Sequence, residues 1–329
     1  MTLRALFLGL FAICFLLFAF SLQSGFAQAG LFESLNALVF GDGTPLTLVL
    51  REIRLPRAIL AVMVGASLGL SGAAMQGYLR NPLAEPGLIG VTASAGLGAV
   101  LAIQTGLTQS IALALPLSAL AASVLAVLLI LALAGPRGRT ITLILAGIAI
   151  SALASALTSL VLNLSPNPFA AAEIVFWMLG SLADRSMTHV WLSLPFVLIG
   201  WALLASLGRG LDALTLGEDT AQALGTNVTA LRLRLILGVA ACVGAATAVA
   251  GAIGFVGLVV PHLLRPLVGG RPSTLLWASA LGGAAMVLAA DIAVREIFPE
   301  RDLKLGVLMA LVGAPLFLHL IYKTRKESA

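Results

Sequence analysis

The run of residues 58–79 constrains the fold of this chain more than any other feature. It contains no charged side chain, and about 20 predominantly apolar residues in a helix suffice to cross the hydrocarbon core of a bilayer. Gly65, Gly69 and Gly72 place small residues at spacings that let a neighbouring helix approach closely. Pro82 follows soon after, and proline stops a helix. The run is therefore predicted to be a membrane span that packs inside a helical bundle, and not a simple anchor.

Composition extends this conclusion to the whole chain. Of its 329 residues, 60% are apolar and only 10% are charged, and the mean hydropathy is +1.08. A soluble globular protein carries about 25% charged residues, so a polytopic membrane protein without a large soluble domain is predicted. In such a protein the pI near 9.9 indicates basic cytoplasmic loops and not a nucleic-acid partner. Cys14 and Cys242 lie far apart in apolar runs, which indicates neither a disulfide nor a metal framework.

Apolar runs separated by polar breaks predict an all-α fold of about ten transmembrane helices. The predicted segments are residues 4–24, 55–77, 88–106, 110–134, 141–164, 188–207, 230–252, 256–269, 273–295 and 304–322, with a short additional apolar helix near 170–181. Segment 256–269 is short for a full crossing and is expected to be buried in protein. Segment 4–24 and the small residues after it resemble a cleavable signal peptide, but the charge distribution favours its retention as the first span.

The charged residues are divided unevenly between the two sides of these segments. With both termini in the cytoplasm, most of the 19 basic residues fall on the cytoplasmic side and most of the 14 acidic residues on the outer side. This distribution obeys the positive-inside rule, which the reversed orientation would break. A multi-pass protein with both termini in the cytoplasm is therefore predicted.

The sequence also repeats itself at a shift of 179 residues. Gly65-Ala66 then aligns with Gly244-Ala245, Gly72-Ala73 with Gly251-Ala252, and Pro82 with Pro261. Because five spans separate the two copies, the copies would point in opposite directions, which is the inverted repeat of many transporters. In a chain this rich in Gly and Ala, chance matches are the alternative.

Four stretches carry a resemblance to a known family. They are RLPR, LSGAAMQ and RNPLAEPGLIGV between residues 54 and 91, ITLILAGIAI at 141–150, LGEDTAQALG with GAIGFVGLVVPHLLR between 216 and 265, and LGVLMALVGAPLFL at 305–318. In this order they resemble the permease family of type II ABC importers, the FecCD-type permeases, which take up iron-siderophores, haem and cobalamin. The resemblance implies a single permease domain over residues 1–329 in the bacterial inner membrane. It also implies a homodimer with two ATPase subunits inside and a periplasmic substrate-binding protein outside.

The energy source is expected to lie on another polypeptide. The sequence contains no G-x-x-x-x-G-K-[ST] loop, since its only lysines are Lys304, Lys323 and Lys326 and none follows a glycine. We therefore expect no enzyme activity, no catalytic residue and no cofactor on this chain, with ATP and magnesium bound by the partner ATPase.

Two other classes of protein are alternatives to the permease, and the sequence supports both less well. An ion-coupled secondary transporter would be expected to bury several acids at mid-membrane, and only Asp291 comes close. An intramembrane enzyme would need a nucleophile with a base, or a set of metal ligands. His189, His262 and His319 are too scattered to supply one.

Residues 208–229 form the longest polar stretch on the predicted cytoplasmic side. Acidic residues begin a short helix within it, and a glycine is placed to cap its end. The motif residues are Gly217, Glu218, Asp219, Ala221, Leu224 and Gly225. The resemblance implies that this segment couples the ATPase to the spans, whereas the residues alone also fit a solvated connector.

Arg54, Arg57 and Arg295 lie at predicted outer ends of spans and are candidates for docking the binding protein. The resemblance implies that they face acidic residues on its two lobes, and a planar guanidinium suits two-point pairing with a carboxylate. The alternative is that they only set the depth of the spans. Asp291 precedes Arg295 by four residues, so an intrahelical ion pair that orients the arginine is predicted.

Asn81, Leu83, Thr140 and Thr142 fall where the resemblance implies a cytoplasmic gate at the dimer axis. The Asn81-Pro82 pair breaks a helix and leaves backbone groups that need partners, as in a corner that lines a cavity. The alternatives are an ordinary loop cap for Asn81 and helix N-caps for the threonines.

The segment FWMLGSLADRSMTHVW at 176–191 resembles haem permeases more than siderophore or cobalamin permeases. Haem is therefore the expected cargo, with ferric siderophores and cobalamin as alternatives. Arg185 and Met178 are candidates for the substrate path, and Arg185 could meet a carboxylate near the outer mouth. No metal site is expected.

Overall fold

In the computed structural model of the protein, residues 2–25, 30, 33–34, 36–37, 40–41, 43–135, 140–297 and 303–327 are described. Every regular element within these ranges is a helix, so the predicted all-α class is confirmed. In chain order the helices are α1 (Leu3–Gln23), α3 (Pro45–Leu48), the π-helix η1 (Val49–Arg54), α4 (Leu55–Leu79), the 3-10 helix η2 (Pro86–Ile89), α5 (Val91–Gln104), α6 (Leu107–Ser110), α7 (Ala114–Ala134), α8 (Thr140–Asn163), α9 (Pro168–Met178), α10 (Met187–Ala205), α11 (Gly208–Leu214), α12 (Glu218–Ala223), α13 (Val228–Ala250), α14 (Val256–Leu264), the 3-10 helix η3 (Pro266–Val268), α15 (Pro272–Ile297) and α16 (Leu305–Glu327).

Each predicted apolar segment coincides with one of these helices. In the described part of the chain, seven helical stretches are long and apolar enough to cross a membrane; they are α1, the continuous stretch Pro45–Leu79, α7, α8, α10, α13 and α15. The stretches Val91–Gln104, Pro168–Met178 and Leu305–His319 are apolar but shorter. Helix α14 has nine residues, which agrees with the short eighth segment. The second segment starts earlier than predicted, because α3 and η1 extend α4 back to Pro45.

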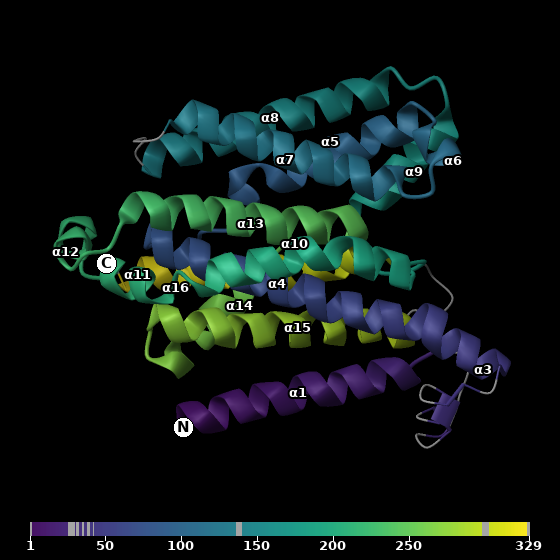
Figure 1. The fold of residues 1–329 in the computed structure, drawn as a ribbon, viewed down its shortest axis with the longest axis horizontal. Helices are drawn as coiled ribbons and strands as arrows, with labels where there is room; N and C mark the ends of the chain where they lie inside the picture. Colours follow the sequence, from purple (N-terminus) through teal and green to yellow (C-terminus); the bar gives the residue numbers. More distant parts are fainter. Residues whose placement is uncertain are drawn as a thin grey trace.

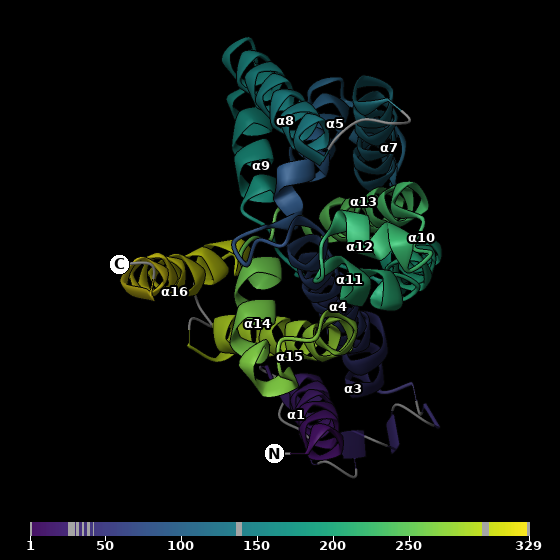
Figure 2. The same cartoon turned by 90° about the vertical axis from the view of Figure 1, so that its left-hand side faces the viewer.

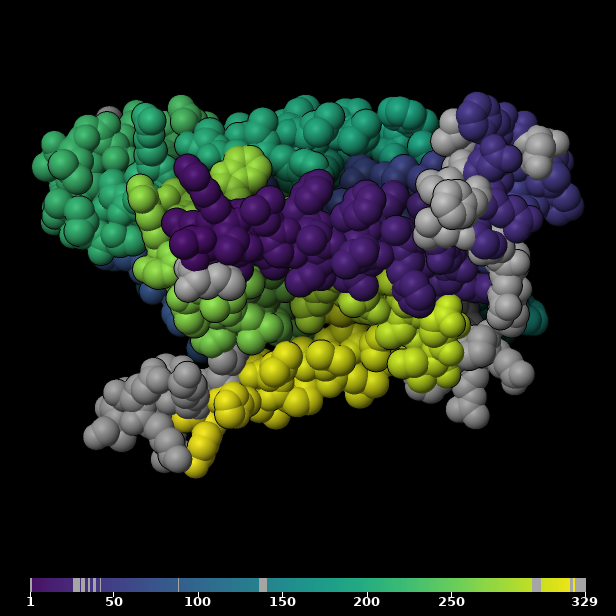
Figure 3. All heavy atoms as spheres, turned by 90° about the horizontal axis from the view of Figure 1, so that it is seen from below, coloured from purple at the N-terminus to yellow at the C-terminus, as the bar shows by residue number. Residues whose placement is uncertain are grey.

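Helix α4 is the central element of the bundle. The long helices lie side by side in Figure 1, and the end-on view of Figure 2 places α4 among α10, α13, α14 and α15. In the most apolar part of the continuous stretch Pro45–Leu79, which includes α4, 89% is buried inside the protein. The corresponding value for α1 is 11%. Helices α5, α7, α8 and α9 form one flank, and α1 lies at the opposite side, across the outer face seen in Figure 3.

The glycines of α4 allow the close approach that their spacing predicts. A Cβ atom added at Gly65 would lie 2.3 Å from the carbonyl oxygen of Gly283, and one at Gly72 would lie 1.9 Å from that of Gly257. At Gly69 the nearest atom would be the carbonyl oxygen of Ser279, at 2.0 Å. These separations are shorter than any real contact, so α4 meets α14 and α15 backbone against backbone.

The packing of α4 and α13 is reciprocal between the two halves of the chain. Helix α4 packs against α14 and α15, and α13 packs against α5 and α7. Gly65 of α4 faces α15 through Gly283, and Gly244, its equivalent at the shift of 179 residues, faces α7 through Ser123. These two equivalent helices thus each lie against helices of the other half, which is consistent with an inverted repeat.

Candidate functional site

Two of the three predicted docking arginines, Arg57 and Arg295, contact the same acidic residue. Asp291 of α15 is buried, and its carboxylate oxygens lie 2.9 Å from Nη2 of Arg57 and 3.1 Å from Nη2 of Arg295. The predicted pair between Asp291 and Arg295 is therefore confirmed, and Arg57 of α4 joins it. The side chains of Arg57 and Arg295 are only 16% and 12% exposed.

Arg54 and Arg295 also hold the C-terminal end of α1. Nη1 of Arg54 donates to the carbonyl oxygens of Leu22 and Gln23 at 3.0 and 3.1 Å, and its side chain is buried. Arg295 donates from Nη1 to the carbonyl oxygen of Ser21 at 3.0 Å and from Nη2 to its hydroxyl at 2.7 Å. The arginines thus supply donors to the last carbonyls of a helix. Their role in docking a binding protein stays a prediction.

The predicted cytoplasmic motif folds as the short helix α12. Glu218 and Asp219 lie in its first turn, and Gly225 follows its end with φ 84°. The N–H of Gly225 donates to Gln222 O at 2.9 Å and that of Thr226 to Ala221 O at 2.9 Å. These two bonds form a Schellman motif, so the predicted glycine cap is confirmed. Leu224 is 64% exposed.

Helix α11, directly before α12, is fixed to the start of α15. Asp212 accepts from the backbone N–H of Ser273 at 2.8 Å, from the Ser273 hydroxyl at 2.7 Å and from Nε of Arg271 at 2.9 Å. Partial burial acts to raise the pKa of Asp212, but the hydrogen bonds from Ser273 and Arg271 outweigh it and lower that pKa below its ordinary value. A displacement of α11 would therefore be transmitted to the N-terminal end of α15.

The predicted gate corner lies between α4 and η2. The side-chain Oδ1 of Asn81 accepts the N–H of Leu83 at 2.9 Å, and both residues lie outside the buried core. This Asx turn is the loop-cap role that was the alternative for Asn81. Thr142 lies in the first turn of α8, half-buried, whereas the side chain of Thr140 lies outside the described part of the chain. A gating role for these four residues stays a prediction.

Two polar residues near this corner, Gln76 and Glu85, make contacts that were not predicted from the sequence. Gln76 is 1% exposed, and its Nε2 donates to the carbonyls of Gly257 and Leu258 at 3.3 Å while its Oε1 accepts from Arg265 at 2.7 Å. Glu85 accepts the N–H of Phe255 at 3.1 Å, and Phe255 has φ 68°, in the left-handed region. Together they join the end of α4 and the following corner to α14. The only signal in the sequence was a Gln and a Glu in apolar or Pro-rich surroundings.

Arg185, a candidate for the substrate path, is engaged inside the protein. Its Nε donates to the carbonyl oxygen of Val249 at 2.6 Å, at the end of α13. Met178, at the end of α9, is 40% exposed and does not share that contact. Among the described residues, no three His, Cys, Asp or Glu side chains gather in a group that could hold a metal ion.

Comparison with known proteins relates this arrangement to one family. The model of the FecCD transport family matches residues 13–323. The chain belongs to the FecCD transport family. Its all-helical bundle is thus the membrane-embedded permease subunit of a type II ABC importer. FecCD permeases are transport subunits and not enzymes, and they work with a separate ATPase subunit and a substrate-binding protein.

Relatives and a solved structure agree with the FecCD assignment over most of the chain. The Fe(3+)-citrate import system permease protein YfmE of Bacillus subtilis is 40% identical over 281 residues, which cover 85% of this chain and 84% of the relative. The cobalamin import system permease protein BtuC of Halobacterium salinarum is 39% identical over 287 residues, covering 86% of this chain and 76% of the relative. The solved structure is an ABC transporter assigned to the metal-chelate type, in an inward-facing conformation. It superposes with a TM-score of 0.86 at 33% identity, covering 97% of this chain and 99% of that chain.

Proposed function

We propose that this chain is the permease through which an ATP-driven importer carries an iron chelate or cobalamin across the bacterial inner membrane. The observation that carries the proposal is the FecCD match over residues 13–323. It is supported by relatives named as Fe(3+)-citrate and cobalamin import permeases. Two copies of this chain, each a single permease domain with both termini in the cytoplasm, form the translocation path. ATP and magnesium are bound by the ATPase.

Haem is the specific cargo that the sequence segment 176–191 favours. The contacts of Arg185 add no support, since its Nε already bonds the carbonyl of Val249. The relatives instead favour ferric citrate or cobalamin as the second candidate. All of these cargoes are metal chelates whose uptake can be followed separately, so one panel of uptake assays distinguishes them.

The cargo is tested in a strain that lacks this permease. Uptake of haem, ferric citrate, a ferric siderophore and labelled cobalamin is measured with and without a plasmid that restores the chain. We expect one of the four to depend on the permease, and haem to be that one if the segment 176–191 determines the choice. If uptake of all four is the same with and without the chain, the proposed cargo class is wrong.

The proposed docking role has a matched pair of variants. Arg57→Gln and Asp291→Asn both break the same ion pair, but only the first removes a positive charge. Charges at the rim of an interface act mainly on the association rate. If the binding protein recognises the charge of Arg57, Arg57→Gln therefore slows association of the binding protein with the permease at low salt, and Asp291→Asn does not. Equal association rates for the two variants would exclude the docking role of Arg57.

The proposed coupling role of α12 rests on its exposed position at one end of the bundle (Figure 1). Ala221 donates its N–H to Gly217 O at 3.0 Å, so Ala221→Pro removes a helical hydrogen bond. We expect this variant to retain binding of cargo-loaded binding protein while ATP hydrolysis no longer drives uptake. Leu267→Asp, at an exposed leucine of η3, is the control. Unchanged uptake by Ala221→Pro would contradict the coupling role.

A further inference from the structure

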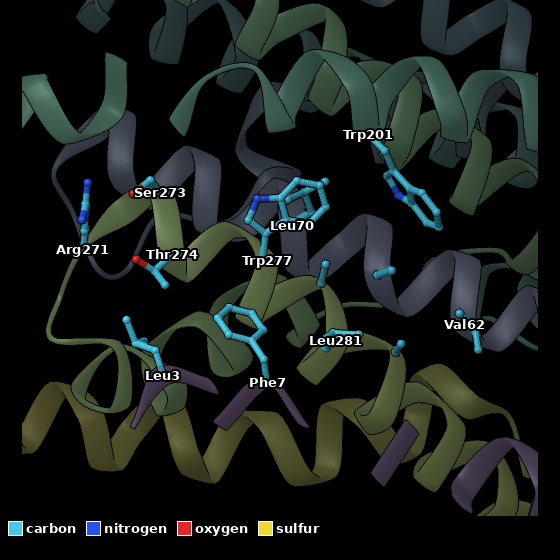
Figure 4. Close-up of a pocket in the computed structure, with 13 residues that line it drawn as sticks. Leu3, Phe7, Val62, Leu70, Trp201, Arg271, Ser273, Thr274, Trp277 and Leu281 are labelled. Carbon is cyan, nitrogen blue, oxygen red and sulfur yellow. The ribbon is translucent and has the colours of Figure 1, made fainter. Parts of the chain in front are cut away.

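A cavity of about 850 Å³ lies between α1, α4, α10 and α15, apart from the sites described above. Its walls are apolar along most of its length, with Phe7 on α1, Leu70 on α4 and Trp277 on α15 among them. Figure 4 shows Arg271 and Thr274 together at one end and Val62 toward the other. The cavity therefore has one polar end and a long apolar interior, which is the polarity of a membrane lipid.

The length of the cavity matches one leaflet of a bilayer. Its lining on α15 extends from Ser273 to Ala284, and eleven residues of helix rise by about 16 Å. The hydrocarbon core of a bilayer is about 30 Å thick, so one leaflet occupies about half of that depth. The polar end coincides with the start of α15, where the interface with water is expected. A lipid whose chains end near the midplane would fill this length.

The wall formed by α1 leaves a lateral route into the cavity. Only Leu6 and Ser21 are buried in α1. Arg54 and Arg295 bond the C-terminal end of this helix, whereas Leu3 and Phe7 at its N-terminal end line the cavity. Figure 3 shows α1 lying across the outer face of the bundle. This single surface helix, with so few buried residues, is the wall at which a lipid can enter from the bilayer.

The polar end is suited to a phosphate group. Arg271 donates to Asp212 only through Nε, and its side chain is 70% exposed. Its two terminal NH₂ groups have no hydrogen-bond partner among the described residues. The helix that begins at Pro272 has 26 residues, and the N-terminal end of a helix attracts anions. The hydroxyl of Thr274 lies beside Arg271 at this end (Figure 4).

The charge around this end is positive. Asp212 is the acidic residue in contact with it, and three donors from Arg271 and Ser273 already occupy its carboxylate. Two further exposed arginines, Arg4 and Arg209, each directly follow a residue that lies at this end of the cavity. Arg4 follows Leu3, and Arg209 follows Gly208, where an added Cβ would lie 3.2 Å from Cβ of Ser273. Basic pockets between membrane helices of this kind bind anionic lipid headgroups.

We propose that this cavity binds one anionic phospholipid, with its phosphate at Arg271 and Thr274 and its acyl chains against Leu70, Trp277 and Phe7. The lipid would fill the space between α1 and the rest of the bundle beside α11, which Asp212 attaches to α15. The proposed orientation of the chain places the polar end on the cytoplasmic side, so the assignment of this lipid to the cytoplasmic leaflet rests on that orientation. The binding itself does not, so a failure of the transport proposal would leave this one unaffected.

The test uses purified full-length permease in detergent, supplied with phosphatidylglycerol or phosphatidylcholine and examined by native mass spectrometry. We expect one phosphatidylglycerol to be retained per chain, and phosphatidylcholine to be retained at least about fivefold less, the factor expected for one basic contact to an anionic lipid. Equal retention of the two lipids would overturn the headgroup assignment.

Two variants address the two ends of the cavity. Ala280→Trp fills its apolar interior, and Thr274→Glu adds a negative charge beside Arg271. Because an acidic residue in the first turn of a helix is favourable, Thr274→Glu should fold well and yet reduce phosphatidylglycerol retention about fivefold or more. Ala132→Trp, at an exposed alanine of α7, is the matched control and should retain the lipid.

Tryptophan fluorescence provides a second readout, which is made in solution and not by mass spectrometry. Trp201 and Trp277 both line the cavity, so phosphatidylglycerol with brominated acyl chains should quench their fluorescence at lower mole fraction than brominated phosphatidylcholine. The preference should disappear in Thr274→Glu. Lipid retention that is the same in both cavity variants and in the control, or a quenching preference that persists in Thr274→Glu, would overturn the proposal. Occupation of the cavity by a second copy of the chain, seen as a crosslink from Leu3 across to Trp277 of another copy, would also overturn it.

Discussion

Arg57 and Asp291, which are 234 residues apart in the sequence, form a two-point contact between α4 and α15. Nε of Arg57 donates to Oδ1 of Asp291 at 2.9 Å and to Oδ2 at 3.1 Å, and Nη2 lies 2.9 Å from Oδ1. Arg295 reaches the same carboxylate from one turn further along α15. One buried acid thus balances two arginines that are themselves mostly buried, and it joins the two helices that pack most closely.

Removing the charge of Asp291 should destabilise the permease. Asp291→Asn leaves Arg57 and Arg295 without a counter-ion in a largely buried setting, and breaking a buried pair in this way costs about 3 kcal/mol or more. We expect a lower midpoint of thermal unfolding, measured by the loss of monodisperse protein on heating. Asp219→Asn, at an exposed acid of α12, is the control. An unchanged midpoint for Asp291→Asn would show that the pair adds no stability.

The contact of Gly72 with α14 predicts that Gly72→Ala destabilises the protein, although Gly→Ala inside a helix is usually stabilising. Gly→Ala inside a helix ordinarily stabilises it by about 0.5–1 kcal/mol. At Gly72 the added Cβ would lie 1.9 Å from Gly257 O, whereas at Gly9 of α1 nothing lies within 4 Å. Gly72→Ala should therefore lower the midpoint of thermal unfolding, and Gly9→Ala should leave it unchanged or raise it. A rise for Gly72→Ala would contradict the close packing of α4 on α14.

The attachment of α11 to α15 should weaken in acid. The pKa of Asp212 is lower in the folded protein than in an unfolded chain, because Ser273 and Arg271 stabilise the carboxylate even though burial opposes this. The contribution to stability is then complete above the ordinary Asp pKa of about 3.9 and is lost as the pH falls through the lower folded value. The protection of α11 amides from hydrogen exchange, corrected for the intrinsic pH dependence of exchange, should decrease below about pH 4 in the wild type.

The control for this acid effect is Asp212→Asn. This variant should exchange faster in α11 already at neutral pH, since the charge-assisted bonds from Arg271 and Ser273 are lost. The corrected protection of its α11 should then show no additional decrease in acid beyond that of other helices. An α11 that stays equally protected in both proteins from pH 7 to pH 3 would exclude the attachment through Asp212.

The sequence predicted the helices and several local contacts well. Apolar runs bounded by polar breaks located the long helices and also the short α9 and α14, because burial in lipid requires continuous apolar segments. The cap of α12 at Gly225 and the pair of Asp291 with Arg295 were predictable because they depend on residues a few positions apart. The family resemblance added the expectation that these helices form one permease domain.

Contacts between distant parts of the chain could not be predicted in this way. Arg57 was expected to face a partner protein, and nothing local indicates that Asp291 would be its neighbour. The same holds for Gln76 and Arg265, which meet across α4 and α14. The spacing of Gly65, Gly69 and Gly72 predicted close approach of another helix, but only the structure shows that α14 and α15 provide it.

We propose that this FecCD permease moves its cargo only when a separate ATPase drives it. The most direct measurement is uptake of the metal chelate into vesicles that contain the permease, with the binding protein outside and the ATPase and ATP inside. We predict uptake against a gradient when all components are present, and none when the ATPase or ATP is omitted, with or without an ion gradient. Accumulation of the chelate by vesicles that lack the ATPase would contradict this account.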